Sequence, residues 1–180
     1  MCISVVASGE FGRIWLFLCR LHPDEKVGGA LRWNVVHETP NQSHYFNCPY
    51  QLGFGESGDK PEMGDEYELE TQEGDVIVLG PNGLFDILFT DQIARLLDTA
   101  LSSTPVFDAY SMEKFASCIA HTAHNAAKGV ETKRPFAGAA QQAGYDYLGE
   151  KRDDITVVTS LVASGDCCDV DVLGTTLKQQ

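Results

Sequence analysis

Residues 76–86 read VIVLGPNGLFD, and this stretch constrains the fold more than any other. The run from Val76 to Leu79 is continuously aliphatic and β-branched, which predicts a central strand buried on both faces. A Gly-Pro-Asn-Gly sequence follows at residues 80–83. A polar residue at the end of a rigid strand can direct a ligand-binding group out of a sheet. Asn-Gly is equally an ordinary tight turn, and the local sequence alone favours the turn.

A second stretch, KRDDITVV at residues 151–158, places two adjacent carboxylates before another apolar run. The residues from Ile155 to Val162 predict a second buried strand. Asp153 or Asp154 could bind a cation as a hard oxygen ligand. Aspartate at the entrance of a strand is also a common turn residue, so this stretch taken by itself leaves both interpretations open.

The remaining periodicities predict strands first and helices later. Strands are expected at residues 3–7, 13–21, 31–37 and 66–71, and helices are expected to begin at Thr90, Ser111 and Pro135, the last ending at Gly144. Residues 38–65 predict a long irregular segment, and residues 164–180 predict a flexible C-terminal tail. The order of strands, helices and a final strand predicts an antiparallel α+β layer fold.

Composition excludes several classes of protein. The 180 residues are 43% hydrophobic and 22% charged, as in a globular protein, and carry a net charge of -13. Such a charge repels nucleic acid, and no apolar run approaches the ~20 residues of a membrane span. The acidic excess fits surface solubility better than it fits metal binding. The six scattered cysteines form no CxxC pair, which predicts reduced thiols in an intracellular protein without a zinc site.

Four segments together resemble the metal-dependent protein phosphatases of the type 2C family. They are GPNGLFDILFTDQI at residues 80–93, KRDDITVVTSLV at residues 151–162, SHYFNCPYQLG at residues 43–53 and RPFAGAAQQAGYDYLGEKRDDIT at residues 134–156. The last two resemble a eukaryotic branch with mitochondrial and plastid members. The resemblance runs from about Val5 to Val162.

The resemblance implies a fold and a chemistry. The family fold is a four-layer α-β-β-α sandwich of two antiparallel sheets, with a binuclear Mg²⁺ or Mn²⁺ centre at one edge. A hydroxide held between two dications is nucleophilic at neutral pH and would attack a phosphoserine or phosphothreonine of a phosphoprotein substrate. Residues 1–163 would then be the later portion of such a domain, incomplete at its N-terminus.

The family pattern also assigns roles to particular residues. Asp153 matches a metal-ligating aspartate, whereas Asn82 stands where the family has a second ligating aspartate. Glu10 would take the place of an aspartate near an accessory metal site. Gly83, Asp86 and Asp154 match structural positions, with Asp86 expected early in a helix; no residue is assigned as catalytic.

Two departures weaken the implied metal centre. An asparagine at position 82 offers one neutral oxygen and no charge, and the family's D-G-[VH]-[GS]-G segment is absent, since Gly28-Gly29 lacks the aspartate. The sequence therefore predicts a protein serine/threonine phosphatase by family whose metal binding is weakened or lost, and which is inactive as written. The alternative is a non-catalytic, pseudophosphatase-like binding module or a truncated gene product. The choice among mitochondrial, plastid and cytoplasmic locations stays open.

The histidines and the HYFN segment have plainer interpretations. His121 and His124 lie three residues apart on an expected helix and are interpreted as structural. His44, Tyr45 and Phe46 are interpreted as loop packing, because no metal-ligand spacing surrounds them.

Overall fold

The computed structural model describes residues 2–6, 14–51, 58–101, 108–129, 133–147, 153–163 and 173–177. Its strands and helices, in chain order, are β1 (Cys2–Val6), β2 (Ile14–Asp24), the 3-10 helix η1 (Glu25–Val27), β3 (Ala30–Glu38), β4 (Ser43–Tyr45), β5 (Cys48–Pro49), the 3-10 helix η2 (Pro61–Met63), β6 (Glu66–Glu70), β7 (Val76–Pro81), α1 (Asn82–Phe85), α2 (Thr90–Leu101), α3 (Ala109–Ala127), α4 (Pro135–Gln142), β8 (Ile155–Leu161) and β9 (Leu173–Leu177). The strands between residues 2 and 81, four helices and a closing strand β8 follow the predicted order.

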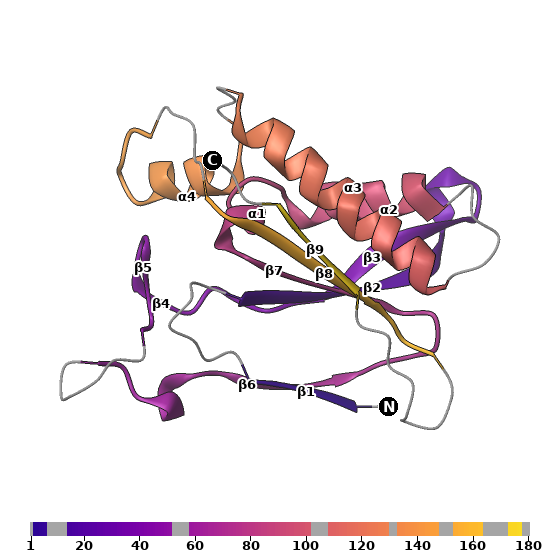
Figure 1. Ribbon diagram of the computed structural model, residues 1–180, viewed down its shortest axis with the longest axis horizontal. Coiled ribbons are helices and arrows are strands. Elements are labelled where there is room, and N and C mark those ends of the chain that lie inside the picture. The colour runs from indigo at the N-terminus through magenta and orange to yellow at the C-terminus, as the bar shows by residue number, and fades with distance from the viewer. Residues whose placement is uncertain are drawn as a thin grey trace.

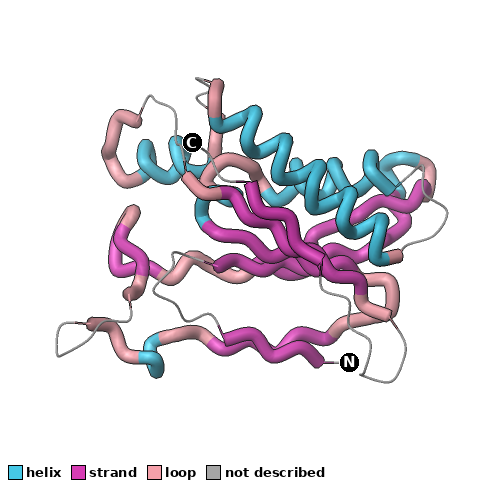
Figure 2. The backbone as a smooth tube through the Cα atoms, in the orientation of Figure 1, coloured by secondary structure: helices cyan, strands magenta, loops and turns pink. Residues whose placement is uncertain are grey.

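A five-stranded antiparallel sheet, in the order β3-β2-β7-β8-β9, forms the centre of the molecule (Figure 1). The helices cover one face of it (Figure 2). On this face Val76 and Val78 of β7 are fully buried with Phe115 and Ile119 of α3. The continuous run at residues 76–79 is thus a central strand, as its composition predicts.

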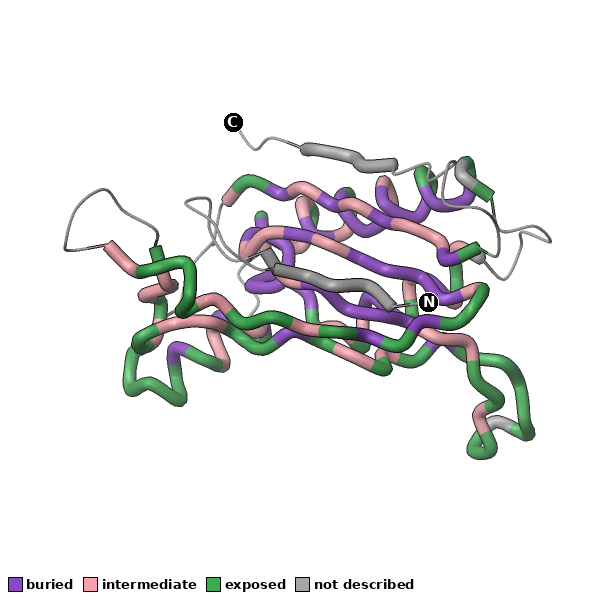
Figure 3. The backbone as a smooth tube through the Cα atoms, turned by 90° about the horizontal axis from the view of Figure 1, so that it is seen from below, coloured by how far each residue is buried: buried purple, intermediate pink, exposed green. Residues whose placement is uncertain are grey.

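A two-stranded antiparallel sheet of β1 and β6 lies on the opposite side of the large sheet (Figure 1). A smaller apolar cluster fills the space between, and it includes Leu16, Leu18, Leu69 and Ile77. Figure 3, seen from this side, shows buried positions along the middle strands and exposed positions towards the rim. The fold is an antiparallel α+β sandwich, as expected, and β2 is buried on both faces because it contributes to both clusters.

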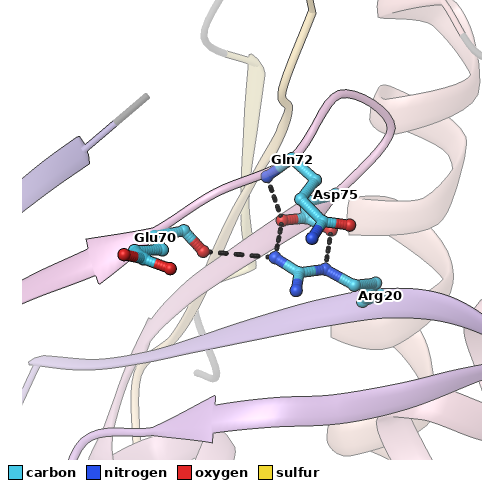
Figure 4. Close-up of polar contacts among 4 residues, drawn as sticks. All are labelled: Arg20, Glu70, Gln72 and Asp75. Carbon is cyan, nitrogen blue, oxygen red and sulfur yellow. Dashed lines mark hydrogen bonds and ion pairs between the residues drawn. The ribbon is translucent and has the colours of Figure 1, made fainter.

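An ion pair ties the two sheets together where β6 turns into β7 (Figure 4). The Arg20 Nε donates to Asp75 Oδ1 at 2.8 Å, and Arg20 Nη2 donates to Asp75 Oδ2 at 2.7 Å and to the Glu70 carbonyl oxygen at 3.1 Å. The Gln72 backbone N–H also donates to Asp75 Oδ2, at 2.7 Å. This network fixes the turn that carries the chain from the small sheet into the large one.

The structure corrects the expectation for the C-terminal residues. Leu173–Leu177 forms β9 and pairs antiparallel with β8, at an edge of the large sheet. The prediction of a tail without regular structure is wrong for these five residues. A short edge strand is held by backbone pairing to its neighbour, and LGTTL carries too little apolar alternation to reveal that pairing.

Three smaller predictions also differ from the structure. The long segment at residues 38–65 contains the β4–β5 hairpin, whose strands are too short for a sequence pattern. Helix α3 begins before Ser111, because Asp108 is its N-cap and accepts a hydrogen bond from the Ser111 backbone N–H at 2.8 Å. Helix α4 ends at Gln142, with Ala143 as its C-cap, rather than at the predicted Gly144.

Candidate functional site

The two stretches singled out in the sequence meet at one edge of the large sheet. Strand β7 pairs antiparallel with β8, so the end of β7 lies beside the start of β8. A Cβ atom built on Gly83 would lie 2.2 Å from the Asp154 carbonyl oxygen and 3.2 Å from Asp153 Cβ. Only glycine permits this approach, and it brings the residue after Asn82 into contact with the backbone that carries Asp153.

Core packing holds Asn82 at this edge. It is the first residue of α1, whose next residues Leu84 and Phe85 are buried. The Phe85 ring stacks on Trp15 at 5.3 Å and meets Phe17 edge-on at 5.2 Å. A polar side chain on such an anchored turn is well positioned for ligand binding, because its backbone is fixed by packing.

Asp153 and Asp154 form a local turn at the entrance of β8. The Asp154 backbone N–H donates to Asp153 Oδ1 at 2.9 Å. Asp153 is partly exposed and Asp154 is exposed. This local hydrogen bond orients the Asp153 carboxylate, and it is compatible with either a turn role or a cation role for the residue.

Asp86 is buried, and its position in the helix differs from the expectation. It lies at the C-cap of α1 rather than early in a helix, because α1 is only four residues long. Its backbone N–H donates to the Asn82 carbonyl oxygen at 2.7 Å, and its carbonyl oxygen accepts from the Phe136 N–H at 3.1 Å. Asp86 thereby links the candidate site to the start of α4.

The donor set available for a metal ion is small. Asp153 and Asn82 offer one carboxylate and one amide, which are hard oxygen donors suited to Mg²⁺ or Mn²⁺. Within the described ranges, no group of three or more His, Cys, Asp or Glu side chains could hold a metal ion. Glu10 lies outside the described residues. The described residues therefore do not fit a binuclear centre by themselves.

Two of the histidines singled out in the sequence, His44 and His121, make hydrogen bonds. The His121 Nδ1 donates to the Ser117 carbonyl oxygen at 2.8 Å, within α3. His44 Nε2 lies 2.9 Å from Asp59 Oδ1. The pKa of Asp59 is lowered, first by the hydrogen bond from the Gln51 N–H and then by His44.

An aromatic cluster of Phe46, Phe136, Tyr145 and Tyr147 joins the β4–β5 hairpin to α4 and the segment after it. Phe46 lies 5.2 Å from Phe136 and 5.5 Å from Tyr145, and Phe136 meets Tyr147 at 4.9 Å, between ring centroids. Phe46 packs within the loop region, as its sequence context predicts, but its partners Phe136 and Tyr145 were not foreseen. All four rings fall within the HYFN and RPFAGAAQQAGYDY segments that carry the family resemblance, which was the available signal.

Two further observations concern the whole chain. No helix of the described residues is long and apolar enough to cross a membrane. Among the described residues, Cys19, Cys48 and Cys118 form no disulfide.

Comparison with known proteins identifies the family. A search against protein-family models finds no match. A probable protein phosphatase 2C 80 from Arabidopsis thaliana is 40% identical over 130 residues, which are 72% of this chain and 30% of that protein. A human protein phosphatase PTC7 homolog is 35% identical over 136 residues, which are 72% of this chain and 43% of that protein. The X-ray structure of the photosystem II phosphatase PBCP superposes with a TM-score of 0.64 at 26% identity, over 89% of this chain and 58% of that chain.

The chain belongs to the type 2C protein phosphatase family. It spans less than half the length of the curated relatives that it matches, between 27% and 44% for those from Arabidopsis, zebrafish and human. Type 2C protein phosphatases generally depend on Mg²⁺ or Mn²⁺. Asn82, which the family resemblance aligns with a ligating aspartate, lies at the edge formed by α1 and the start of β8.

Proposed function

We propose that this chain carries one side of the metal site of a protein serine/threonine phosphatase, a class that hydrolyses phosphoserine and phosphothreonine in proteins with Mg²⁺ or Mn²⁺. The supporting observation is the contact between Gly83 and the backbone of Asp153-Asp154, which places two separate stretches of the family pattern at one sheet edge. Each residue at this edge then has a distinct role.

Asp153 supplies the negative oxygen of the site. The Asp154 N–H holds its Oδ1 at 2.9 Å and so restricts the orientation of the carboxylate. Asn82 supplies a neutral amide oxygen from the first turn of α1. Gly83 sets the spacing between the two donors, because any larger residue would collide with the Asp154 carbonyl group.

The neutral residue at position 82 determines how well the site holds a cation. A dication gains much less from an amide than from a carboxylate, and by analogy with unpaired buried charge the difference is several kcal/mol, about 3–5. We therefore propose that the 180-residue chain binds Mn²⁺ weakly and does not turn over substrate.

A second candidate function is a phosphoprotein-binding module without catalysis. Two observations favour it over an active enzyme: the asparagine at position 82, and the lack of a third acidic or metal-ligating side chain beside it among the described residues. In this case the fold would still present a surface for phosphoproteins.

The test is calorimetric titration of Mn²⁺ into the full chain, with Asp153→Ala and Asp154→Ala as a matched pair. Asp154→Ala keeps the backbone N–H that holds Asp153 Oδ1, so it removes a neighbouring carboxylate and nothing else from the turn. Weak Mn²⁺ binding that Asp153→Ala abolishes and Asp154→Ala preserves is expected.

Hydrolysis of p-nitrophenyl phosphate with Mn²⁺ tests whether the chain is an active enzyme, whereas the Mn²⁺ titration separates a weak metal site from a module that binds no metal. Absence of turnover is expected for the chain as it stands. Tight binding of two Mn²⁺ ions with turnover would overturn the inactive assignment, and equal effects of the two alanine variants would overturn the role of Asp153.

A further inference from the structure

The outer rim of the aromatic cluster is exposed although its base is buried. Phe136 is 8% exposed, whereas Tyr145 is 60% exposed and Tyr45, next to Phe46 on the hairpin, is 69% exposed. The hairpin lies close to α4 (Figure 1), and Asn47 takes a left-handed φ of 57° in the turn between β4 and β5. The tight turn presents Phe46 to the cluster and leaves Tyr45 at its edge.

Tyr45 and Tyr145 belong to the same rim. Phe46 stacks on Tyr145 with an interplanar angle of 28°. The pKa of Tyr45 is raised, mainly by its hydrogen bond with Cys48 across the hairpin, and Tyr145 is near enough to contribute to the shift. Two exposed aromatic faces on one rim form a surface that a flat or apolar side chain can cover.

Asp146 places a negative charge next to this rim. Asp146 lies between Tyr145 and Tyr147 in the chain, is exposed, and takes part in none of the ion pairs formed by the described residues. Asp59 is held on the hairpin by His44 and Gln51. A guanidinium group suits such a place, because it stacks on aromatic faces and pairs with carboxylates. A phosphate would be repelled by the same carboxylates.

The buried base of the cluster, Phe136, is joined to the candidate metal site by two backbone hydrogen bonds. The Phe136 N–H donates to the Asp86 carbonyl oxygen at 3.1 Å, and the Asp86 N–H donates to the Asn82 carbonyl oxygen at 2.7 Å. A peptide whose phosphorylated residue lies at the Asn82–Asp153 edge would therefore pass close to the rim with its neighbouring residues.

We propose that Tyr45, Tyr145 and Asp146 form a docking surface for an arginine side chain of the phosphoprotein, a few residues from the phosphorylated serine or threonine. The inference rests on the proposed function, since it assigns a preference for basic phosphopeptides to the same site. The phosphate binds at the sheet edge and the arginine binds at the rim, so the two groups are recognised separately.

The experiment measures binding rather than turnover. Fluorescence anisotropy of the full chain, without metal, compares a fluorescein-labelled phosphothreonine peptide containing two arginines with the same peptide containing glutamines. Replacing arginine by glutamine is expected to weaken binding about ten-fold, and Tyr45→Ala or Asp146→Asn about five-fold each. Tyr145→Phe keeps the ring and is expected to bind like the original chain.

Tyr110→Ala is the matched control. Tyr110 on α3 is 61% exposed and also lies beside a cation, since Lys114 Nζ is 4.3 Å from its ring centroid, but it is not part of the rim. Thermal unfolding followed by circular dichroism shows that each variant is folded. Tyr45 makes no ring contact with the cluster among those described, so Tyr45→Ala tests the surface even where Tyr145→Ala disturbs packing.

Equal binding of the arginine and glutamine peptides would overturn the proposal, as would an equal loss in Tyr110→Ala. Concentration-dependent dimerisation that Tyr45→Ala removes would assign the rim to a second copy of the chain instead, and would also overturn it. Because the anisotropy needs no metal, a failure to bind Mn²⁺ affects the proposed function and leaves this comparison readable.

Discussion

Replacing Arg20 by methionine should destabilise the fold strongly, because it leaves a buried carboxylate without its cation. The Asp75 side chain is 1% exposed and accepts two hydrogen bonds from the Arg20 guanidinium (Figure 4). Methionine keeps an unbranched apolar side chain of similar reach over the sheet. The substitution therefore removes the positive charge and its hydrogen bonds but keeps the apolar packing of the side chain.

The expected loss follows from the burial of the pair. Removing one partner of a buried ion pair costs about 3–5 kcal/mol. The Arg20 side chain is 18% exposed, and the Gln72 N–H still donates to Asp75 in the variant. Both facts favour the lower end, about 3 kcal/mol, which is a large part of the stability of an ordinary domain.

The loss should also depend on pH. Burial disfavours the charged form of Asp75, but the hydrogen bonds from Arg20 and Gln72 outweigh it, so the pKa of Asp75 is lowered. In the original chain the ionised carboxylate therefore adds stability above its unfolded pKa of about 3.9, and that stability is lost as the pH falls through the lower native pKa. Without Arg20, burial raises the native pKa of Asp75. Protonation of Asp75 on acidification then removes the unpaired buried charge, so the variant recovers stability as the pH falls. The difference between the two proteins is expected to shrink from pH 7 to pH 4.

Urea unfolding followed by circular dichroism at both pH values measures this difference. Arg95→Met is the matched control, because Arg95 and Asp91 form an ion pair of 2.8 Å whose side chains are 65% and 67% exposed. Such a pair contributes only about 0.3–0.5 kcal/mol. A loss below about 1 kcal/mol in Arg20→Met, or an equal loss at pH 7 and pH 4, would refute the assignment of Asp75 as a buried charge that depends on Arg20.

Three further outcomes follow from single contacts. Gly83→Ala should lower the free energy of unfolding, measured with urea, by at least about 3 kcal/mol, because the added Cβ would meet the backbone oxygen of Asp154. Gly138→Ala is the control: its Cβ would meet nothing within 4 Å, so it should be neutral or stabilising. Similar losses in both variants would contradict the contact at Gly83. Asn82→Asp should raise the affinity for Mn²⁺ at least about ten-fold in calorimetry, and an unchanged affinity would mean that residue 82 does not face the cation. Burial raises the pKa of the Cys19 thiol to about 12. Alkylation at pH 8 followed by peptide mass spectrometry should therefore find Cys19 unlabelled until urea unfolds the chain. Rapid labelling of Cys19 in the native protein would contradict its burial.

The strands that the sequence predicts well are those whose burial is visible in their own composition. The run at Val76–Pro81 and the strand Ile155–Leu161 are central in the sheet, and both are apolar throughout or on one face. Strand β9 and the β4–β5 hairpin depend on backbone pairing with other segments. Residues 173–177 contain two threonines and a glycine, and no local pattern distinguishes them from a loop.

In the candidate site too, the features that the local sequence does not reveal are contacts between segments far apart in the chain. Nothing local in the sequence joins Asn82 to Asp153, which are far apart in the chain; the family resemblance suggested the pairing, and the Gly83 contact gives its geometry. The aromatic cluster was missed because Phe46 and Phe136 approach only when the hairpin folds against α4. Asp86 was misplaced because the apolar residues that follow it resemble a continuing helix, whereas α1 ends at Phe85.

Geometry and charge are determined by different residues at this edge. Gly80 and Gly83 allow close packing of α1 against β8, since a Cβ on Gly80 would lie 2.7 Å from Leu84 Cδ2 and 3.1 Å from the Thr156 carbonyl oxygen. The buried side chains of Leu84 and Phe85 then hold α1 without help from a cation. The turn would therefore keep its position whether residue 82 is asparagine or aspartate, and only the charge presented to a metal would differ. If residue 82 faces a metal, as we propose, its charge could change without a change of fold, so retention of the fold would be no measure of activity.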